Sequence, residues 1–218
     1  MKTTVIFDLD GTLLDTLDDL HAALNRALTE NGLPERSRNE VRAFVGNGIP
    51  LLAHRGVPSG TAPETERRVL DALLSFYTAH CRERTCPYPG VTDALSALKE
   101  RGVRVAVVTN KAQAAAETLC GAYFGGLADC VVGGRPDLPK KPAPEPVFEA
   151  LKALGVSARE AVYVGDSEVD LKTAENVGLP ILPVGWGFRT PGQLFAAGAH
   201  TVYMTAEALL GALLEPGV

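Results

Sequence analysis

This sequence of 218 residues has no apolar run that approaches the length of a membrane-spanning helix. Its first residues also lack the basic segment, apolar stretch and small-residue cleavage site that make up a secretory signal. Internal repeats and low-complexity tracts are absent as well. We therefore expect a cytoplasmic protein without a membrane partner, and its composition is ordinary for a soluble enzyme.

Cysteine and clustered positive charge are scarce. The four cysteines, Cys81, Cys86, Cys120 and Cys130, lack the paired spacing of a zinc site, and we interpret them as reduced packing residues. The 21 Lys and Arg residues are scattered and are outnumbered by 26 Asp and Glu, which gives a net charge of −5. This balance argues against nucleic acid as a partner, although a phosphate pocket needs only a few local cations.

Helical patterning dominates the stretch from about residue 16 to 85. Leucines repeat at helical spacing over residues 17–28, one or two short helices are predicted over 38–54, and a long amphipathic helix is predicted over 64–81. This segment follows the apolar Val5-Ile6-Phe7, which reads as a buried strand.

Strands alternate with helices in the rest of the chain. Helices are predicted over 92–101, 111–123, 144–154 and 168–177, strands over 103–108, 130–132, 161–165 and 180–184, and a Gly- and Pro-rich loop over 133–146. The alternation predicts an α/β fold, a doubly wound parallel sheet covered on both faces. The helical segment 16–85 would then be a small inserted domain, and residues 1–15 and 86–218 would form the larger one.

Two carboxylates follow the first predicted strand. Asp8 and Asp10 stand at positions i and i+2, so they are expected to point to the same side beyond the tip of the strand. Gly11 and Thr12 then turn the chain and leave free backbone N–H groups. Such a pair suggests a metal site, an acid/base pair or both, although Asp-x-Asp-Gly is also a common surface turn.

Polar residues also follow the later strands, at the edge where open parallel sheets bind ligands. Thr109-Asn110-Lys111 ends the strand predicted over 103–108, Gly165 to Asp170 ends the strand predicted over 161–165 and continues past it, and Lys140-Lys141 precedes a helix start that favours an anion. Taken singly, Thr109-Asn110 can cap a helix and Lys141 can be a solvated loop charge. Taken together, these oxygen ligands and cations predict a site for Mg²⁺, rather than zinc, and an anion.

In these motifs the chain resembles the haloacid dehalogenase superfamily of phosphotransferases over nearly its whole length. The family's order is matched by Asp8-x-Asp10-Gly-Thr, Thr109-Asn110-Lys111, Lys141-Pro-x-Pro and Gly165-Asp166-Ser167-x-x-Asp170. The resemblance implies a Rossmann-like core with a small, mobile, all-helical cap. It also implies a phosphatase that uses Mg²⁺ and an aspartyl-phosphate intermediate.

The chain is most similar to the bacterial phosphoglycolate phosphatases within this superfamily. The similarity lies in Val45 to Gly48, Pro87 to Val91 and Lys141 to Pro146. Val184-Gly185-Trp186-Gly187-Phe188 resembles the last core loop of that subgroup, where a Gly-Tyr pair is more usual. The segment 54–60 departs from the subgroup, whose members continue a helix there.

The resemblance assigns catalytic roles to the strand-end residues. Asp8 is implied to be the nucleophile, and Asp10 the general acid and then the general base. We expect a like charge and burial to raise the pKa of Asp10, whereas bound Mg²⁺ would keep Asp8 ionised. Thr109, Asn110 and Lys141 are implied to hold the phosphoryl group.

The implied metal ligands are drawn from the same residues. Mg²⁺ would be held by the Asp8 carboxylate, the Asp10 backbone carbonyl and the Asp166 carboxylate. Asp170 would support the ion through bound water or through the lysine.

Substrate recognition is predicted in the cap. Gly46, Asn47 and Gly48 would offer backbone amides, and Arg55 would pair with a substrate carboxylate. We expect a small-molecule substrate, 2-phosphoglycolate or a similar small phosphate ester, and a monomer or homodimer. The sequence assigns no role to His54 or Arg189.

Three other functions are compatible with this core. A phosphosugar mutase of the β-phosphoglucomutase kind shares the two acids, but it needs more sugar contacts than the cap offers. A pyrophosphatase and a non-catalytic binding module are the remaining alternatives. A phosphonate hydrolase would need a cap lysine for a Schiff base, and residues 16–85 contain no lysine.

Overall fold

The computed structural model describes residues 3–215 and divides the chain into two compact units. The larger unit consists of Met1–Leu14 and Pro87–Val218, and the smaller unit is Asp15–Cys86. The chain passes between them through β2 (Leu14–Asp15) and β3 (Cys86–Pro87), which pair as a two-stranded ribbon.

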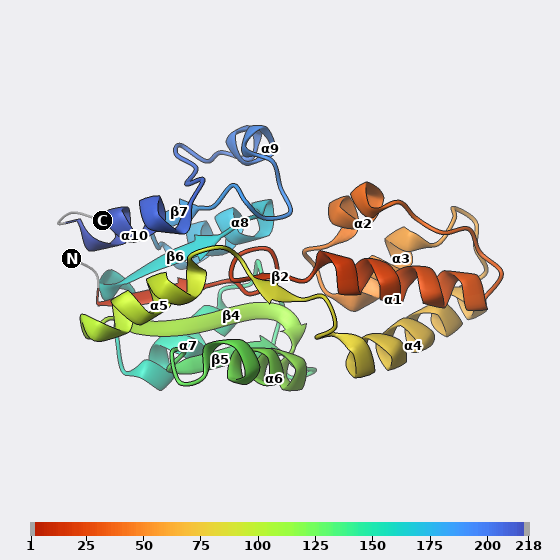
Figure 1. The fold of residues 1–218 in the computed structure, drawn as a ribbon, viewed down its shortest axis with the longest axis horizontal. Helices are drawn as coiled ribbons and strands as arrows, with labels where there is room; N and C mark the ends of the chain where they lie inside the picture. Colours follow the sequence, from red (N-terminus) through yellow and green to blue (C-terminus); the bar gives the residue numbers. More distant parts are fainter. Residues whose placement is uncertain (1–2, 216–218) are drawn as a thin grey trace. The chain divides into compact units, whose positions relative to one another are not determined.

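A parallel sheet of five strands forms the centre of the larger unit, in the order β5-β4-β1-β6-β7 (Figure 1). The strands are β1 (Thr4–Phe7), β4 (Arg104–Ala112), β5 (Cys130–Gly134), β6 (Ala161–Gly165) and β7 (Ile181–Pro183). The predicted α/β fold class with a doubly wound parallel sheet is confirmed. Since β1 lies between β4 and β6, residues that follow these three strands meet at one edge of the sheet.

Helices cover both faces of this sheet. They are α5 (Val91–Glu100), α6 (Gln113–Phe124), α7 (Glu145–Leu154), a 3₁₀ turn (Ala158–Glu160), α8 (Glu168–Val177), α9 (Pro191–Ala196) and α10 (Ala206–Leu214). Ile6 faces a core that α7 and α8 complete, whereas the neighbouring Phe7 lies beside α5 and α10. This division follows from the alternation of side chains along a strand.

The structure differs from the predicted elements in three places. Strand β4 continues through Thr109–Lys111 to Ala112, past a register shift against β5, so these residues do not cap the next helix. Strand β5 includes Gly133 and Gly134, which we expected in a loop. Helices α9 and α10 were not predicted, although Thr190 and Thr205 cap their N-termini and mark both in the sequence.

The smaller unit is built from four helices. They are α1 (Leu17–Glu30), α2 (Arg38–Phe44), α3 (Ile49–Gly56) and α4 (Pro63–His80). The interruption at Gly46-Asn47-Gly48 separates α2 from α3, as the glycines indicate. Leu24, Val69 and Leu73 are fully buried in the interior of this unit.

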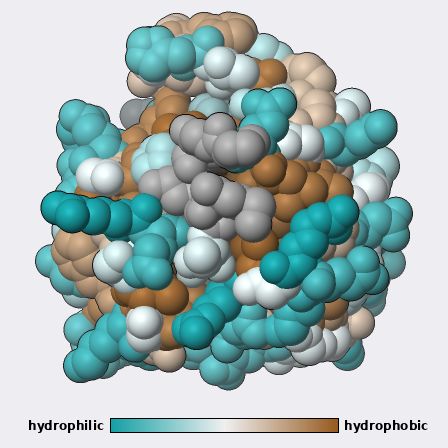
Figure 2. Space-filling model, turned by 90° about the vertical axis from the view of Figure 1, so that its left-hand side faces the viewer, coloured by the Kyte–Doolittle hydropathy of each residue, from teal (hydrophilic) through white to brown (hydrophobic). Residues whose placement is uncertain are grey.

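Hydrophilic side chains surround several apolar areas at the end of the larger unit where the sheet strands begin (Figure 2). The strand-end residues that we predicted to form a site lie at the other edge of the sheet. Across residues 3–215, every helix is too short or too polar to cross a lipid bilayer.

Candidate active site

Three buried aspartates meet where β1 and β6 end. Ligand oxygens of Asp8, Asp166 and Asp170 all lie within 4.8 Å of one another. Asp8 follows β1 and Asp166 follows β6, while Asp170 stands in the first turn of α8. Gly11 has a φ of 90°, and a Cβ there would overlap the Asp166 carboxylate, so both its conformation and its neighbour demand glycine.

Lys141 supplies the positive charge of this cluster. Its Nζ lies 2.8 Å from Oδ1 of Asp8 and donates a hydrogen bond of 2.8 Å to Oδ1 of Asp170. It also donates to the hydroxyl of Tyr163 at 3.0 Å, and that hydroxyl donates to Oδ1 of Asp170 at 3.1 Å. Because Lys141 is only 3% exposed, the solvated-loop alternative is ruled out.

The cluster is short of positive charge, because three carboxylates face one ammonium group. Burial raises the pKa of Asp8 to about 7; Lys141 opposes the rise, and Asp170 and Asp10 add to it. Burial and the charges of Asp170 and Asp8 likewise raise the pKa of Asp166 well above its usual value. For Lys141, the attraction of Asp170 and Asp8 outweighs burial and holds its pKa well above the usual range.

These residues fit a hard divalent cation. Oδ1 of Asp8 is buried and lies 2.8 Å from the Lys141 ammonium, and a carboxylate oxygen keeps a second lone pair beside such a contact. Such an atom is available as a ligand, and carboxylate oxygens are the donors that Mg²⁺ prefers. A divalent cation would also compensate the excess negative charge of the cluster.

Asp10 is paired with Lys111, a residue of the Thr109-Asn110-Lys111 motif to which we assigned no catalytic role from the sequence. Nζ of Lys111 donates to both carboxylate oxygens of Asp10, at 3.0 Å and 3.2 Å. The Lys111 side chain is 3% exposed and the Asp10 side chain 17% exposed, so this ion pair is partly buried. We expected a like charge and burial around Asp10 and no cationic side chain; the Thr-Asn-Lys motif was the available signal for Lys111.

Thr109 and Asn110 lie in the last part of β4, both buried. The Thr109 hydroxyl accepts a hydrogen bond from the Lys111 N–H at 3.2 Å. The Asn110 amide holds the backbone of Lys141, since Nδ2 donates to the carbonyl at 3.1 Å and Oδ1 accepts from the N–H at 2.8 Å. Asn110 therefore positions Lys141, a role that we did not predict, and phosphoryl binding by Thr109 and Asn110 stays a prediction.

The predicted cap residues lie in the smaller unit. Gly46 and Gly48 have φ values of 129° and 85°, which require glycine on either side of Asn47. Nη1 of Arg55 donates to the Phe44 carbonyl at 2.8 Å, so part of its guanidinium supports the turn between α2 and α3. Their assignment as substrate ligands stays a prediction.

Structural partners explain the two residues to which we assigned no role. Nδ1 of His54 lies 2.8 Å from Oε1 of Glu66, which ties α3 to α4. Arg189 is 7% exposed and donates from Nε and Nη2 to the two carboxylate oxygens of Glu168, at 2.7 Å and 3.0 Å.

The sequence matches the haloacid dehalogenase-like hydrolase family over residues 5–184. The chain belongs to this family. It is 40% identical over 190 residues to a phosphoglycolate phosphatase of Cereibacter sphaeroides, with 85% of this chain and 86% of that protein covered. Together the family and its relatives make this chain a phosphatase of the haloacid dehalogenase type.

Solved structures of relatives share the whole fold of this phosphatase. A candidate phosphoglycolate phosphatase from Lactobacillus delbrueckii subsp. bulgaricus matches with a TM-score of 0.94 and 33% identity, covering 99% of this chain and 100% of that one. A variant of CbbY from Rhodobacter sphaeroides, in complex with xylulose-1,5-bisphosphate, matches with a TM-score of 0.73 and 27% identity, covering 94% and 95%.

Proposed function

We propose that this phosphatase hydrolyses a small phosphate monoester in two steps, with Asp8 as the nucleophile and Mg²⁺ as the cofactor. The observation that supports this most strongly is the buried cluster of Asp8, Asp166 and Asp170 around one lysine. A phosphomonoester carries a charge of about −2, so it can approach Asp8 only where positive charge is concentrated.

In the first step, an Asp8 carboxylate oxygen attacks phosphorus and the bond to the ester oxygen breaks. The leaving alkoxide takes its proton from Asp10, and the product is an alcohol and an aspartyl-phosphate. Both oxygens of Asp10 accept from Lys111 in the structure, so the oxygen that carries the proton must give up its hydrogen bond to Lys111, while the other oxygen can keep its own.

In the second step, water attacks the phosphorus of the aspartyl-phosphate. Asp10 takes a proton from the water, and the bond between phosphorus and the Asp8 oxygen breaks. This releases inorganic phosphate and restores the Asp8 carboxylate. The pairing of Asp10 with Lys111 suits this step, because Asp10 acts as a base in it.

Bound Mg²⁺ would supply positive charge next to the transferring phosphoryl group. The Asp8 and Asp166 carboxylates and the backbone carbonyl of Asp10 would hold it, with Asp170 in support. Lys141 complements that charge from the protein side, because it lies against both Asp8 and Asp170. Thr109 and Asn110 would orient the phosphoryl oxygens.

We further propose that the helical segment 16–85 acts as a cap that selects the substrate. The relatives named phosphoglycolate phosphatase support 2-phosphoglycolate as the first candidate. Arg55 and the backbone amides at Gly46, Asn47 and Gly48 would bind its carboxylate. The complex of the CbbY variant supports a sugar bisphosphate as the second candidate.

The test is phosphate release from a panel of phosphomonoesters, with and without Mg²⁺. The panel contains 2-phosphoglycolate, xylulose-1,5-bisphosphate, a nucleotide, pyrophosphate and β-glucose 1-phosphate, the last also assayed for glucose 6-phosphate to detect a mutase. We expect Mg²⁺-dependent release, with 2-phosphoglycolate turned over fastest. Turnover that persists fully without divalent cations would contradict the role of Mg²⁺.

The nucleophile is tested by Asp8→Asn, with Asp93→Asn on the exposed face of α5 as the matched control. We expect Asp8→Asn to reduce turnover by about 10³-fold or more while it keeps the fold, and Asp93→Asn to be unaffected. Rapid acid quenching with a labelled substrate should trap phosphate on the wild type and on Asp93→Asn, but not on Asp8→Asn. Wild-type-like turnover by Asp8→Asn would reject Asp8 as the nucleophile.

A further inference from the structure

A short segment after β7 lies directly against Asp166. We call residues 185–189 the Asp166 clamp; their sequence is Gly-Trp-Gly-Phe-Arg. The Phe188 N–H donates to Oδ2 of Asp166 at 2.7 Å, while the hydroxyl of Thr12 donates to Oδ1 at 3.0 Å. Both oxygens of this predicted metal ligand are therefore oriented, one by the clamp and one by the turn that follows β1.

Gly187 shows how closely the clamp approaches. A Cβ at this position would overlap the Gly11 carbonyl and the Asp166 carboxylate. Glycine at both Gly11 and Gly187 thus allows two backbone segments to enclose one side chain. Because both segments lie this close to Asp166, we expect a displacement of either one to move its carboxylate.

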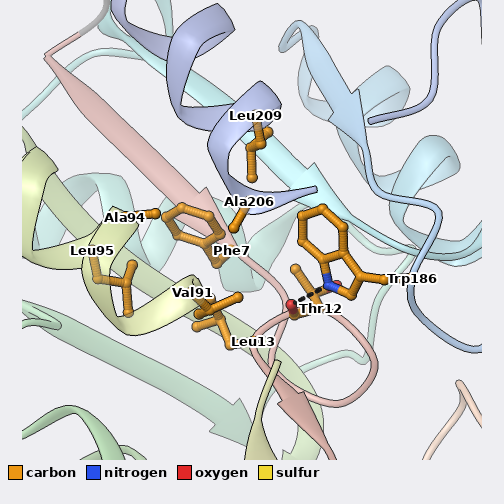
Figure 3. A pocket seen from close by; sticks show the side chains of 9 residues that line it. All are labelled: Phe7, Thr12, Leu13, Val91, Ala94, Leu95, Trp186, Ala206 and Leu209. Atoms are coloured by element: carbon orange, nitrogen blue, oxygen red, sulfur yellow. Dashed lines mark hydrogen bonds between the residues drawn. The ribbon is translucent and has the colours of Figure 1, made fainter. Parts of the chain in front are cut away.

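Trp186 ties the clamp to the turn after β1. Its Nε1 donates a hydrogen bond of 3.0 Å to the Thr12 carbonyl, as Figure 3 shows. The indole also lines a small pocket together with Phe7, Val91 and Leu209 (Figure 3). This pocket is apolar and too small for an organic ligand. The ring therefore packs rather than binds, while its N–H fixes the residue whose hydroxyl orients Asp166.

Arg189 anchors the other end of the clamp. Its fork-like contact with Glu168 joins the clamp to the first turn of α8, two residues beyond Asp166. A bidentate pair of this kind restricts orientation as well as distance. Arg189 is 7% exposed, whereas the Glu168 side chain is 48% exposed, so the arginine side of the pair is buried and the carboxylate side faces water.

We propose that the Asp166 clamp is a positioning element for the cation site, with Trp186 and Arg189 as its two anchors, and that it sets the affinity of the phosphatase for Mg²⁺. This inference rests on the proposed function, because it assumes that Asp166 binds Mg²⁺. Residues that orient a metal ligand from behind commonly change metal affinity by about 10–100-fold when replaced. Trp186 acts on Asp166 through Thr12, and Arg189 acts on it through the backbone of the clamp, so we expect both anchors to affect binding of the ion before they affect the chemistry.

The first test is Trp186→Phe, which keeps an aromatic ring in the pocket and removes the N–H. We expect the Mg²⁺ concentration for half-maximal turnover to rise about 10-fold, with kcat at saturating Mg²⁺ within about 3-fold of the wild type. The rise in Tm caused by a fixed Mg²⁺ concentration should shrink in parallel, which measures binding without turnover. Leu209→Val is the matched control: it loosens the same pocket but leaves Thr12 bonded, and its Mg²⁺ dependence should match the wild type.

The second test is Arg189→Lys, which keeps the positive charge and loses the bidentate hydrogen bonding to Glu168. We expect the same direction of change in both readouts, about 3–10-fold in Mg²⁺ requirement. If the Mg²⁺ concentration for half-maximal turnover stays within twofold of the wild-type value in both variants, the proposed role of the Asp166 clamp is wrong. A wild type whose turnover and Tm are both insensitive to Mg²⁺ would instead refute the cofactor assignment in the proposed function.

Discussion

Nζ of Lys111 lies within 3.2 Å of both carboxylate oxygens of Asp10, although the two residues are 101 positions apart in the chain. They meet because β1 and β4 are parallel neighbours in a register that pairs Phe7 with Val107. Asp10 and Lys111 follow those positions by three and four residues, so both reach the same edge of the sheet. The proposed acid/base residue is therefore held by a fixed cation.

Replacement of Lys111 by methionine should slow turnover. Without the ammonium group, Asp10 loses the contact that orients it for the second step, and misorientation of a catalytic group can cost about 10²-fold. We expect a fall in kcat of about 10–100-fold, partial recovery in Lys111→Arg, and an unchanged Mg²⁺ requirement. Lys152→Met, at an exposed position of α7, is the control. If kcat is equal in Lys111→Met and the wild type, Lys111 does not orient Asp10 for catalysis.

Replacement of Asn110 by alanine should lower stability and turnover together. It leaves the N–H and carbonyl of buried Lys141 without their partners in Asn110. The loss of such partners costs about 1–3 kcal/mol. Asn39→Ala, at an exposed position of α2, is the control and should keep the stability of the wild type. Urea denaturation measures both free energies of unfolding, and wild-type stability in Asn110→Ala would show that Lys141 is held by other contacts.

The metal-free phosphatase should lose stability as pH rises toward neutrality. The pKa of Asp8 is 3.8 in its ordinary state and about 7 in the folded protein. Between pH 3.8 and about pH 7, Asp8 keeps a proton in the folded state that it has lost in the unfolded state. The free energy of unfolding therefore falls as the pH rises through this range, and the contribution of Asp8 to this fall ends above about pH 7. The raised pKa of Asp166 acts in the same direction.

Addition of Mg²⁺ should reverse this loss, because the cation replaces the protons on the cluster. We therefore expect a larger rise in Tm with Mg²⁺ at about pH 8 than at about pH 5. Asp8→Asn should flatten the pH dependence of the metal-free protein. Thermal unfolding across this pH range provides the measurement, and stability that rises steadily up to pH 8 without metal would contradict the charge excess of the cluster.

Replacement of Arg55 by methionine should weaken binding of acidic substrates alone. A charged hydrogen bond to a substrate carboxylate contributes about 1.5–3 kcal/mol, so KM for 2-phosphoglycolate should rise about 10-fold or more. KM for p-nitrophenyl phosphate, which has no carboxylate, should stay the same. Arg67→Met on the exposed side of α4 is the control. An equal rise in both KM values would point to loss of the Phe44 contact instead.

Much of this fold is readable from local pattern. The alternation of strands and helices predicts the parallel sheet, and the run of helices in 16–85 predicts the smaller unit, since both signals depend on residues close in sequence. Asp8 and Asp166 were found in the same way, because each directly follows an apolar strand. The extension of β4 through Thr109–Lys111 was missed, since it depends on pairing with a neighbouring strand.

By itself the sequence determined the fold class and the acidic residues at the ends of the strands, because periodicity and strand ends are local properties of a chain. Only the tertiary structure decided which cation faces which acid: Lys141 lies against Asp8 and Asp170, and Lys111 against Asp10. It also decided that residues 185–189 lie against Asp166. These partners depend on strand order and register, which bring together residues that are far apart in the chain.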